Sequence, residues 1–140
     1  MAGVAWGVDF LLSLRVMAHH NNLGRWGEDI ACERLVAAGY AIAARNWRSG
    51  HYEVDIVAMK GTHVVFGEVK TRSEGAGDPL DAVDSRKIAR MIASARAYME
   101  MAGLERHTVQ FDLFGITAGA DGAPTVEHIP DAVELPLSTC

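Results

Sequence analysis

The sequence predicts an α/β sandwich built around a mixed β-sheet, with its elements in the order αβββαββ. Apolar residues recur at helical spacing in two long segments, residues 23–38 and 85–102, and shorter segments rich in Val, Ile and Phe lie between and after them. The chain has 140 residues, 49% of them hydrophobic, so it is large enough to bury a core without disulfide or metal support.

Each predicted helix has a recognisable end. Gly39 follows the first helix and Gly103 follows the second, and glycine readily adopts the left-handed conformation found after a helix C-terminus. Asp84 or Ser85 is expected to cap the second helix. The strands are predicted over residues 40–48, in a hairpin over 53–72, and over 108–116 and 125–129, with a glycine-rich loop over 73–79 and another loop over 119–124.

The predicted hairpin gathers charged residues at one end of one face. Gly61 and Thr62 suit a two-residue turn, and antiparallel pairing around it sets Asp55 opposite Glu68. Strand side chains alternate between the two faces of a sheet. The alternation predicts one face with Glu53, Asp55, Val57, Met59, Val64, Phe66, Glu68 and Lys70, and another with Val54, Ile56, Ala58, Val65 and Val69.

Carboxylates crowded at the edge of a buried face repel one another unless a cation or a proton intervenes. Oxygen ligands select a hard divalent ion, so Asp55 and Glu68 predict a site for Mg²⁺, with Mn²⁺ as its usual substitute. Lys70 would orient a water or stabilise charge that grows on a phosphate. The alternative is an exposed hairpin with cross-strand ion pairs, chiefly Glu53 with Lys70. The spacing leaves both interpretations open.

The first helix supplies a further acidic candidate. Glu28 projects from the edge of an apolar face that includes Gly27, Ala31 and Leu35. A carboxylate facing the core is costly unless it is paired, protonated or bound to metal, although at a helix edge it can also reach water. Gly24 and Gly27 indicate that a strand or a nucleic-acid backbone approaches this turn closely.

The charge distribution bears on a nucleic-acid partner. The net charge of −5 argues against one at first sight, because phosphate binding usually requires a basic surface. The acidity is concentrated in residues 100–140, however, and the second helix carries several basic residues. Such a set is typical of a solvated face and can also line a DNA-binding groove. The candidates for phosphate contacts are Arg25, Arg45, Arg48, Arg72, Lys87 and Arg90.

The cysteines and the chain ends suggest a cytoplasmic protein. Cys32 and Cys140 match no zinc or redox spacing, which is typical of a reducing compartment. Asp9 and Arg15 interrupt the apolar run near the N-terminus, which is far shorter than a bilayer span of about 20 residues, so we expect no membrane insertion. The expected organisation is a poorly ordered extension or interface helix over residues 1–22, a domain over 23–133 and a tail over 134–140.

Six segments in register resemble the bacterial YraN-like family. They are GRWGEDIA (24–31), RNWR (45–48), YEVDIVA (52–58), GEVKTR (67–72), FDLFGI (111–116) and EHIPDAV (127–133). That family is usually grouped with the restriction-endonuclease-like, or PD-(D/E)XK, nucleases and is similar to archaeal Holliday junction resolvases. The resemblance implies a restriction-endonuclease-like α/β/α sandwich around a mixed central β-sheet.

The resemblance also implies roles for individual residues. Asp55 and Glu68 match the metal-binding acids, which act with the Val69 carbonyl, and Lys70 matches the catalytic lysine. Glu28 matches the helix glutamate that completes the metal site in resolvase-like members. Glu53 matches the acid two residues before the aspartate, which implies a supporting role. The sequence departs from the family pattern at Val54, where proline is common, at His51–Tyr52, and at Gly67, where a larger apolar residue is usual.

The expected function is a Mg²⁺- or Mn²⁺-dependent DNA endonuclease that hydrolyses phosphodiester bonds. Branched, flapped or junction DNA are the substrates expected of a repair or recombination nuclease, and a homodimer is expected by analogy with resolvases. The alternative is a nucleic-acid-binding module that keeps the nuclease fold with little or no catalysis. A structural partner protein that binds no nucleic acid is a third interpretation.

Overall fold

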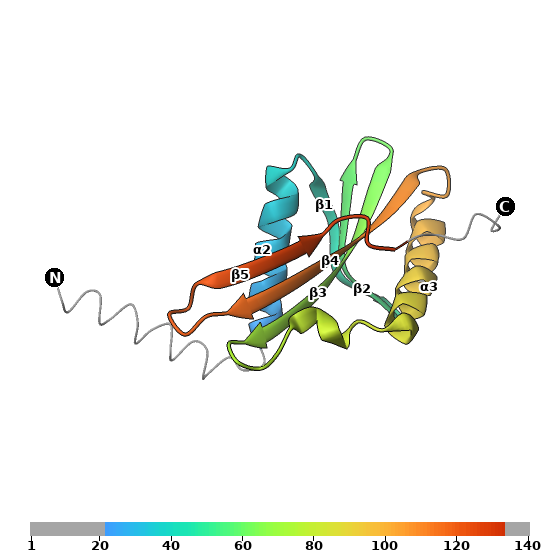
Figure 1. Ribbon diagram of the computed structural model, residues 1–140. Helices are drawn as coiled ribbons and strands as arrows, with labels where there is room; N and C mark the ends of the chain where they lie inside the picture. Colours follow the sequence, from blue (N-terminus) through green and yellow to red (C-terminus); the bar gives the residue numbers. More distant parts are fainter. Residues whose placement is uncertain (1–21, 134–140) are drawn as a thin grey trace.

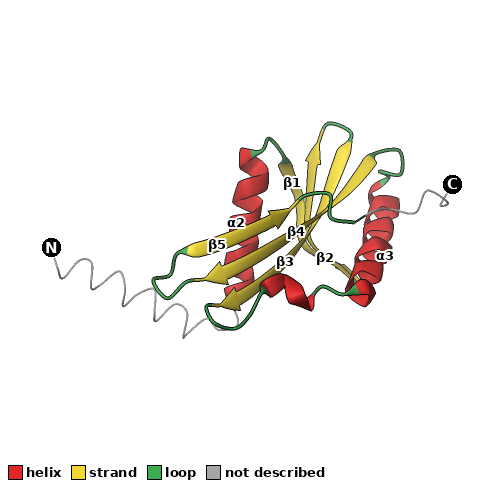
Figure 2. Cartoon of the chain, in the orientation of Figure 1, coloured by secondary structure: helices red, strands yellow, loops and turns green. Residues whose placement is uncertain are grey.

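A computed structural model describes residues 22–133 as a five-stranded β-sheet with a long helix on each face (Figure 1). The strands lie in the order β1-β2-β3-β4-β5, and the sheet is mixed because β3 and β4 are parallel while the other neighbours are antiparallel (Figure 2). The elements are α2 (Leu23–Ala37), β1 (Ala41–Ser49), β2 (Tyr52–Lys60), β3 (His63–Ser73), the short 3₁₀ helix η2 (Pro79–Ala82), α3 (Ser85–Ala102), β4 (Thr108–Ala118) and β5 (Pro124–Ile129).

The observed order confirms the predicted αβββαββ sandwich. Apart from Asn22, the expected extension over residues 1–22 and the tail over 134–140 lie outside the described residues. Within residues 22–133, no helix combines the length and apolar character needed to cross a bilayer.

Both helices end where glycine predicts. Gly39, just beyond α2, has φ +95°, and Gly103 takes the left-handed conformation directly after α3. Of the two predicted caps, Asp84 is the one used, since its side chain accepts the backbone N–H of Lys87 at 2.9 Å. The cap fixes the first turn of α3 and therefore the position of Lys87.

The sheet separates two hydrophobic clusters, and each is covered by one helix. Burial of such side chains stabilises the fold by roughly 1.5–3 kcal/mol each, so packing on both faces holds the strands and helices in place. The α3 cluster includes Val57, Val64, Phe66, Met91, Ala95, Tyr98 and Phe111, and the α2 cluster includes Ala31, Leu35, Ile56, Val65, Phe114 and Ile116.

The hairpin has the predicted register near its turn. Gly61 has φ +59°, and the paired residues run from the turn as far as Ile56 and Gly67. Beyond that pair, the backbone N–H of Val69 donates to the Asp55 carboxylate at 2.9 Å. A side-chain hydrogen bond therefore joins the two strands where the regular ladder stops.

The prediction for Val54 is wrong. Strict alternation sets Val54 on the same face as Ile56, but Val54 packs in the α3 cluster and Ile56 packs in the α2 cluster. Alternation with period two assumes an uninterrupted strand. The interruption lies at Asp55, whose carboxylate accepts a hydrogen bond from the Val69 N–H. Val54 and Ile56, on either side of Asp55, therefore face opposite sides of the sheet.

Glycines mark close approaches on the α2 side of the sheet. A β-carbon at Gly27 would overlap Thr71 Oγ1, so the predicted approach at this turn is made by strand β3. Gly24 has no atom within 4 Å of the position of a β-carbon. Gly67 lies beneath Phe114, where a β-carbon would be 3.4 Å from the ring and in ordinary contact. Contact at Gly27 brings α2 against the end of β3 that carries the charged residues.

Candidate active site

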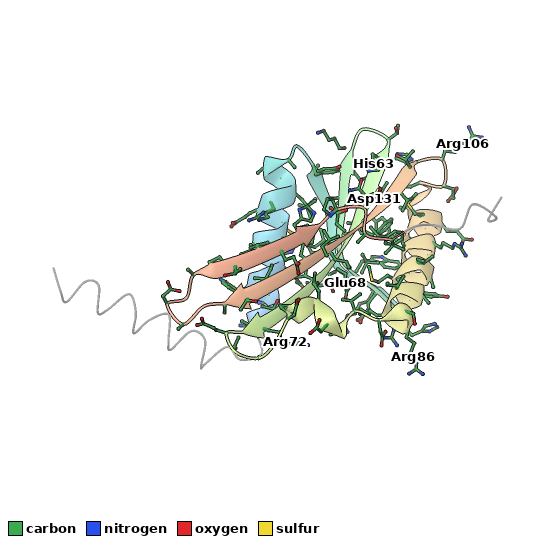
Figure 3. All side chains as sticks on the ribbon, in the orientation of Figure 1. His63, Glu68, Arg72, Arg86, Arg106 and Asp131 are labelled. Atoms are coloured by element: carbon green, nitrogen blue, oxygen red, sulfur yellow. The ribbon has the colours of Figure 1, made fainter. Side chains whose placement is uncertain are left out.

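Asp55 of β2 and Glu68 of β3 form an electrostatically interacting carboxylate pair. Glu68, labelled in Figure 3, lies between the sheet and α3 and is 6% exposed. Asp55 is half-buried. Burial and, next, the charge of Glu68 raise the pKa of Asp55 from 3.8 to about 7, although the Val69 N–H opposes the shift. Near neutral pH, the pair therefore favours a bound proton or a neighbouring cation.

Two lysines approach the same oxygen of Glu68. Lys70 Nζ lies 3.7 Å from Glu68 Oε1, so the structure brings the predicted acid and lysine together. Lys87 Nζ, from the first turn of α3, lies closer, at 2.9 Å. The sequence predicts a phosphate contact for Lys87 and gives no sign of this contact with a buried carboxylate. The cap at Asp84 locates the start of the helix. Which way the Lys87 side chain points from the first turn depends on how α3 packs against the sheet.

Glu28 faces this region from α2. Its side chain is 14% exposed and accepts a hydrogen bond from Asn46 Nδ2 at 2.9 Å. Burial raises the pKa of Glu28, the Asn46 bond opposes that shift, and the charge of Asp55 adds to it. Glu28 is therefore largely covered and within electrostatic reach of Asp55. The sequence carried no signal for the contribution of Asn46.

Glu53 lies apart from the carboxylate pair. Its carboxylate is 3.6 Å from Arg48 Nη2, and both side chains are exposed. Lys70 is paired with Glu68 instead. The cross-strand pair of Glu53 with Lys70, which an exposed hairpin would favour, is thus replaced by two other ion pairs.

The other predicted phosphate-contacting residues have different surroundings. Arg45 binds Asp29 of α2 at 2.7 Å, and it lies 3.9 Å from Glu28. The hydrogen bond to Asp29 raises the pKa of Arg45, and burial of the guanidinium opposes only part of that rise. Arg72 is half-buried and donates to a backbone carbonyl. Arg25 and Arg90 are exposed.

The donor set is of the kind that a hard divalent ion uses. Mg²⁺ commonly binds one or two carboxylates and keeps several waters, and Asp55, Glu68 and the Val69 carbonyl would supply such a set. The mutual repulsion of the two carboxylates supplies the reason for a cation there. Among residues 22–133, no three His, Cys, Asp or Glu side chains are gathered as ligands of one ion. In this conformation Glu28 interacts with the carboxylate pair electrostatically, through the charge of Asp55.

A second buried carboxylate, Asp112 of β4, has a structural role that the sequence did not reveal. It is 2% exposed and accepts hydrogen bonds from His128 Nε2 at 2.7 Å, Gln110 Nε2 at 2.8 Å and the Asp131 backbone at 3.1 Å. The His128 ring also stacks on Phe114, with centroids 4.2 Å apart. These contacts satisfy the buried carboxylate and join β4 to β5 and the turn that follows.

Sequence comparison finds a family model and close relatives. The model is described as "Uncharacterised protein family UPF0102" and matches residues 27–116. A UPF0102 protein of Bacteroides thetaiotaomicron is 43% identical over 122 residues, which cover 86% of this chain and 99% of that protein. One of Porphyromonas gingivalis is 43% identical over 123 residues, covering 86% and 90%. One of Rhodococcus jostii is 42% identical over 117 residues, covering 83% and 99%. The segment matched by the model contains every acid and lysine of the candidate site.

Proposed function

This chain belongs to the UPF0102 family, and we propose that it is a metal-dependent endonuclease that hydrolyses phosphodiester bonds in DNA. The proposal is carried by the partly buried carboxylate pair of Asp55 and Glu68, with Lys70 Nζ 3.7 Å from Glu68 Oε1. Burying two repelling acids beside a lysine lowers stability, and such arrangements are typical of sites where chemistry requires them. The resemblance to PD-(D/E)XK nucleases supports the same assignment.

The residues of the site would divide the work of hydrolysis. Asp55, Glu68 and the Val69 carbonyl would hold Mg²⁺ or Mn²⁺. When bound, that ion would activate a water and neutralise charge on the scissile phosphate. Lys70 would orient the attacking water or stabilise the phosphate as its negative charge grows. Glu28 would add negative charge that strengthens the attraction of the site for a cation.

DNA is the substrate class that we favour. Arg25 and Arg90 are exposed and available to phosphates, whereas Arg45 and Arg48 already pair with acids. Selectivity for branched, flapped or junction DNA, and a homodimer with two active sites that cut paired strands, extend the proposal by analogy with resolvases. Work on chromosomal DNA in a bacterium would take place in the cytoplasm, in agreement with the cysteine pattern.

A nucleic-acid-binding module without efficient turnover is the second candidate. One observation favours it: Lys87 already neutralises Glu68. Such a module would retain the fold and the contacts between basic side chains and DNA phosphates, but it would not cleave the DNA.

Cleavage assays distinguish these functions. Junction, flap, single-stranded and duplex DNA would each be incubated with the protein in Mg²⁺, Mn²⁺ or EDTA. We expect metal-dependent cleavage that falls at least about 100-fold in Asp55→Asn and Lys70→Met, while Glu33→Gln, an exposed acid of α2, retains it. Cleavage unchanged in Asp55→Asn would overturn the site. Binding without cleavage would favour the module, and neither activity would favour a structural partner protein.

A further inference from the structure

Lys87 and Glu68 form a tight ion pair in the candidate site. Their Nζ and Oε1 atoms are 2.9 Å apart, and the two side chains are 18% and 8% exposed. Lys70 lies 3.7 Å from the same oxygen and is more exposed, at 28%. Glu68 therefore has a closer and better covered partner on α3 than the lysine on its own strand.

The packing of α3 directs Lys87 toward the sheet. Met91, one helical turn further along, lies in the α3 cluster together with Ala95 and Tyr98. Lys87 is thus on the buried side of the helix, and the Asp84 cap holds the first turn in place. Arg86 is exposed and points away from the domain in Figure 3. The contact with Glu68 follows from the same packing that holds α3 on the sheet.

An ammonium group at this position opposes the binding of a divalent ion. Both cations would use the same carboxylate, and two positive charges a few ångströms apart repel strongly where water is largely excluded. Removal of Lys87 would also leave the buried Glu68 carboxylate with only Lys70, at 3.7 Å, as an ion-pair partner. A buried charge that loses its nearest partner destabilises the fold. The metal-free and metal-bound sites therefore have opposite requirements for Lys87.

We propose that Lys87 is the resident counterion of Glu68 and that a divalent ion must displace it to load the site. This inference rests on the proposed function, because it takes Glu68 as a ligand of that ion. Lys87 then acts on metal loading through Glu68, as a positioning residue. It keeps the site neutralised, and the fold stable, whenever the metal is absent.

Mn²⁺ binding at fixed pH tests the exchange without any cleavage assay. Isothermal titration of the full chain should show at least about tenfold tighter binding in Lys87→Met than in the wild type. Lys87→Arg, which keeps the charge, should bind like the wild type. Arg86→Met removes an exposed charge from the same turn of the helix and is the matched control. Equal affinities in Lys87→Met and the wild type would overturn the inference.

Glu68→Gln separates this inference from the proposed function. If the wild type binds Mn²⁺ and Glu68→Gln binds it equally well, the assigned metal site is wrong. If Glu68→Gln loses binding but Lys87→Met does not tighten it, only the exchange is wrong.

Thermal unfolding without metal provides an independent measurement. Lys87→Met should lower Tm, and the double variant Lys87→Met/Glu68→Gln should recover most of the loss, because neither charge is then left alone. A double variant as unstable as Lys87→Met would mean that lost packing causes the effect, and it would overturn the counterion role.

Discussion

Asn46 of β1 and Asp55 of β2 lie at the same level of neighbouring strands, and side-chain alternation slips by one residue in both strands there. The paired residues on either side of this level keep the same register. In each strand, two residues that are three positions apart both pack in or against the α3 cluster. Strict alternation would place two such residues on opposite faces of the sheet. These residues are Ala44 and Trp47 in β1, and Val54 and Val57 in β2.

The slip at Asn46 leads to the first prediction. Asn46 has φ +51° and donates to Glu28. Replacement by alanine should lower the free energy of unfolding by about 1–2 kcal/mol, because alanine tolerates positive φ less well than asparagine and the hydrogen bond is lost. Asn46→Gly should lose less, since glycine adopts this φ freely. Urea denaturation measures both. Equal losses would assign the effect to the hydrogen bond alone.

The contribution of Asp55 to stability should decrease as pH rises in the metal-free protein. The pKa of Asp55 is raised from 3.8 to about 7 in the fold, so between those values the folded state holds a proton that the unfolded state has released. Stability from this group is therefore full below about pH 4 and is lost as pH rises through about 7. Asp55→Asn should remove the slope and increase stability at pH 8 by on the order of 1 kcal/mol.

Urea midpoints at several pH values in EDTA check this dependence. Glu33→Gln, an exposed acid on α2, should keep the wild-type slope. A wild-type stability that rises steadily from pH 4 to pH 7, and an identical curve for Asp55→Asn, would contradict the prediction.

Gly27 and Thr71 should behave as a coupled pair. Gly27→Ala would force its β-carbon against Thr71 Oγ1, a buried oxygen without a hydrogen-bond partner within the described part of the chain. Overpacking of this kind costs about 1–3 kcal/mol. The double variant Gly27→Ala/Thr71→Ala should recover most of the loss, because the β-carbon that remains at position 71 is 3.4 Å away, at ordinary contact distance. Non-additivity in a double-mutant cycle measures the coupling, and a fully additive result would mean that the helix simply shifts.

His128 should stabilise the fold through Asp112. His128→Phe keeps a ring that can stack on Phe114 but removes the hydrogen bond to the buried carboxylate, which should cost about 1–3 kcal/mol. Calorimetric Tm values would show the loss. His51→Phe, at an exposed position in the β1–β2 turn, should change stability by less than about 0.5 kcal/mol. Similar Tm shifts in the two variants would contradict a specific role for His128.

Local rules in the sequence were sufficient for much of the fold. Glycines after helices and the Asp84 cap located the helix ends, and the Gly61 turn fixed the register that sets Asp55 level with Glu68. These features depend on residues close together in the chain. The turn determines this register because it fixes which residues are paired within about ten positions on either side of it.

Features that depend on distant packing were not predictable. Val54 changed faces because Asp55 interrupts the strand, and the alternation rule contains no such interruption. Lys87 reaches Glu68 only because α3 docks across the sheet, which no spacing along the helix specifies. The support of Glu28 by Asn46 likewise joins residues 18 positions apart.

Because β3 and β4 are parallel, a long connection joins them, and its two loops, before and after η2, should differ in how well they tolerate inserted residues. The chain must cross from one end of the sheet to the other, and it is anchored on the way at η2, where Leu80 packs so close to Gly115 that a β-carbon would not fit. Extra residues in the glycine-rich segment 74–78 would bulge outward and leave the anchor in place. Extra residues between Ala82 and Ser85 would rotate the start of α3 and move Lys87 away from Glu68. The length of this connection therefore controls the ion pair between the two side chains.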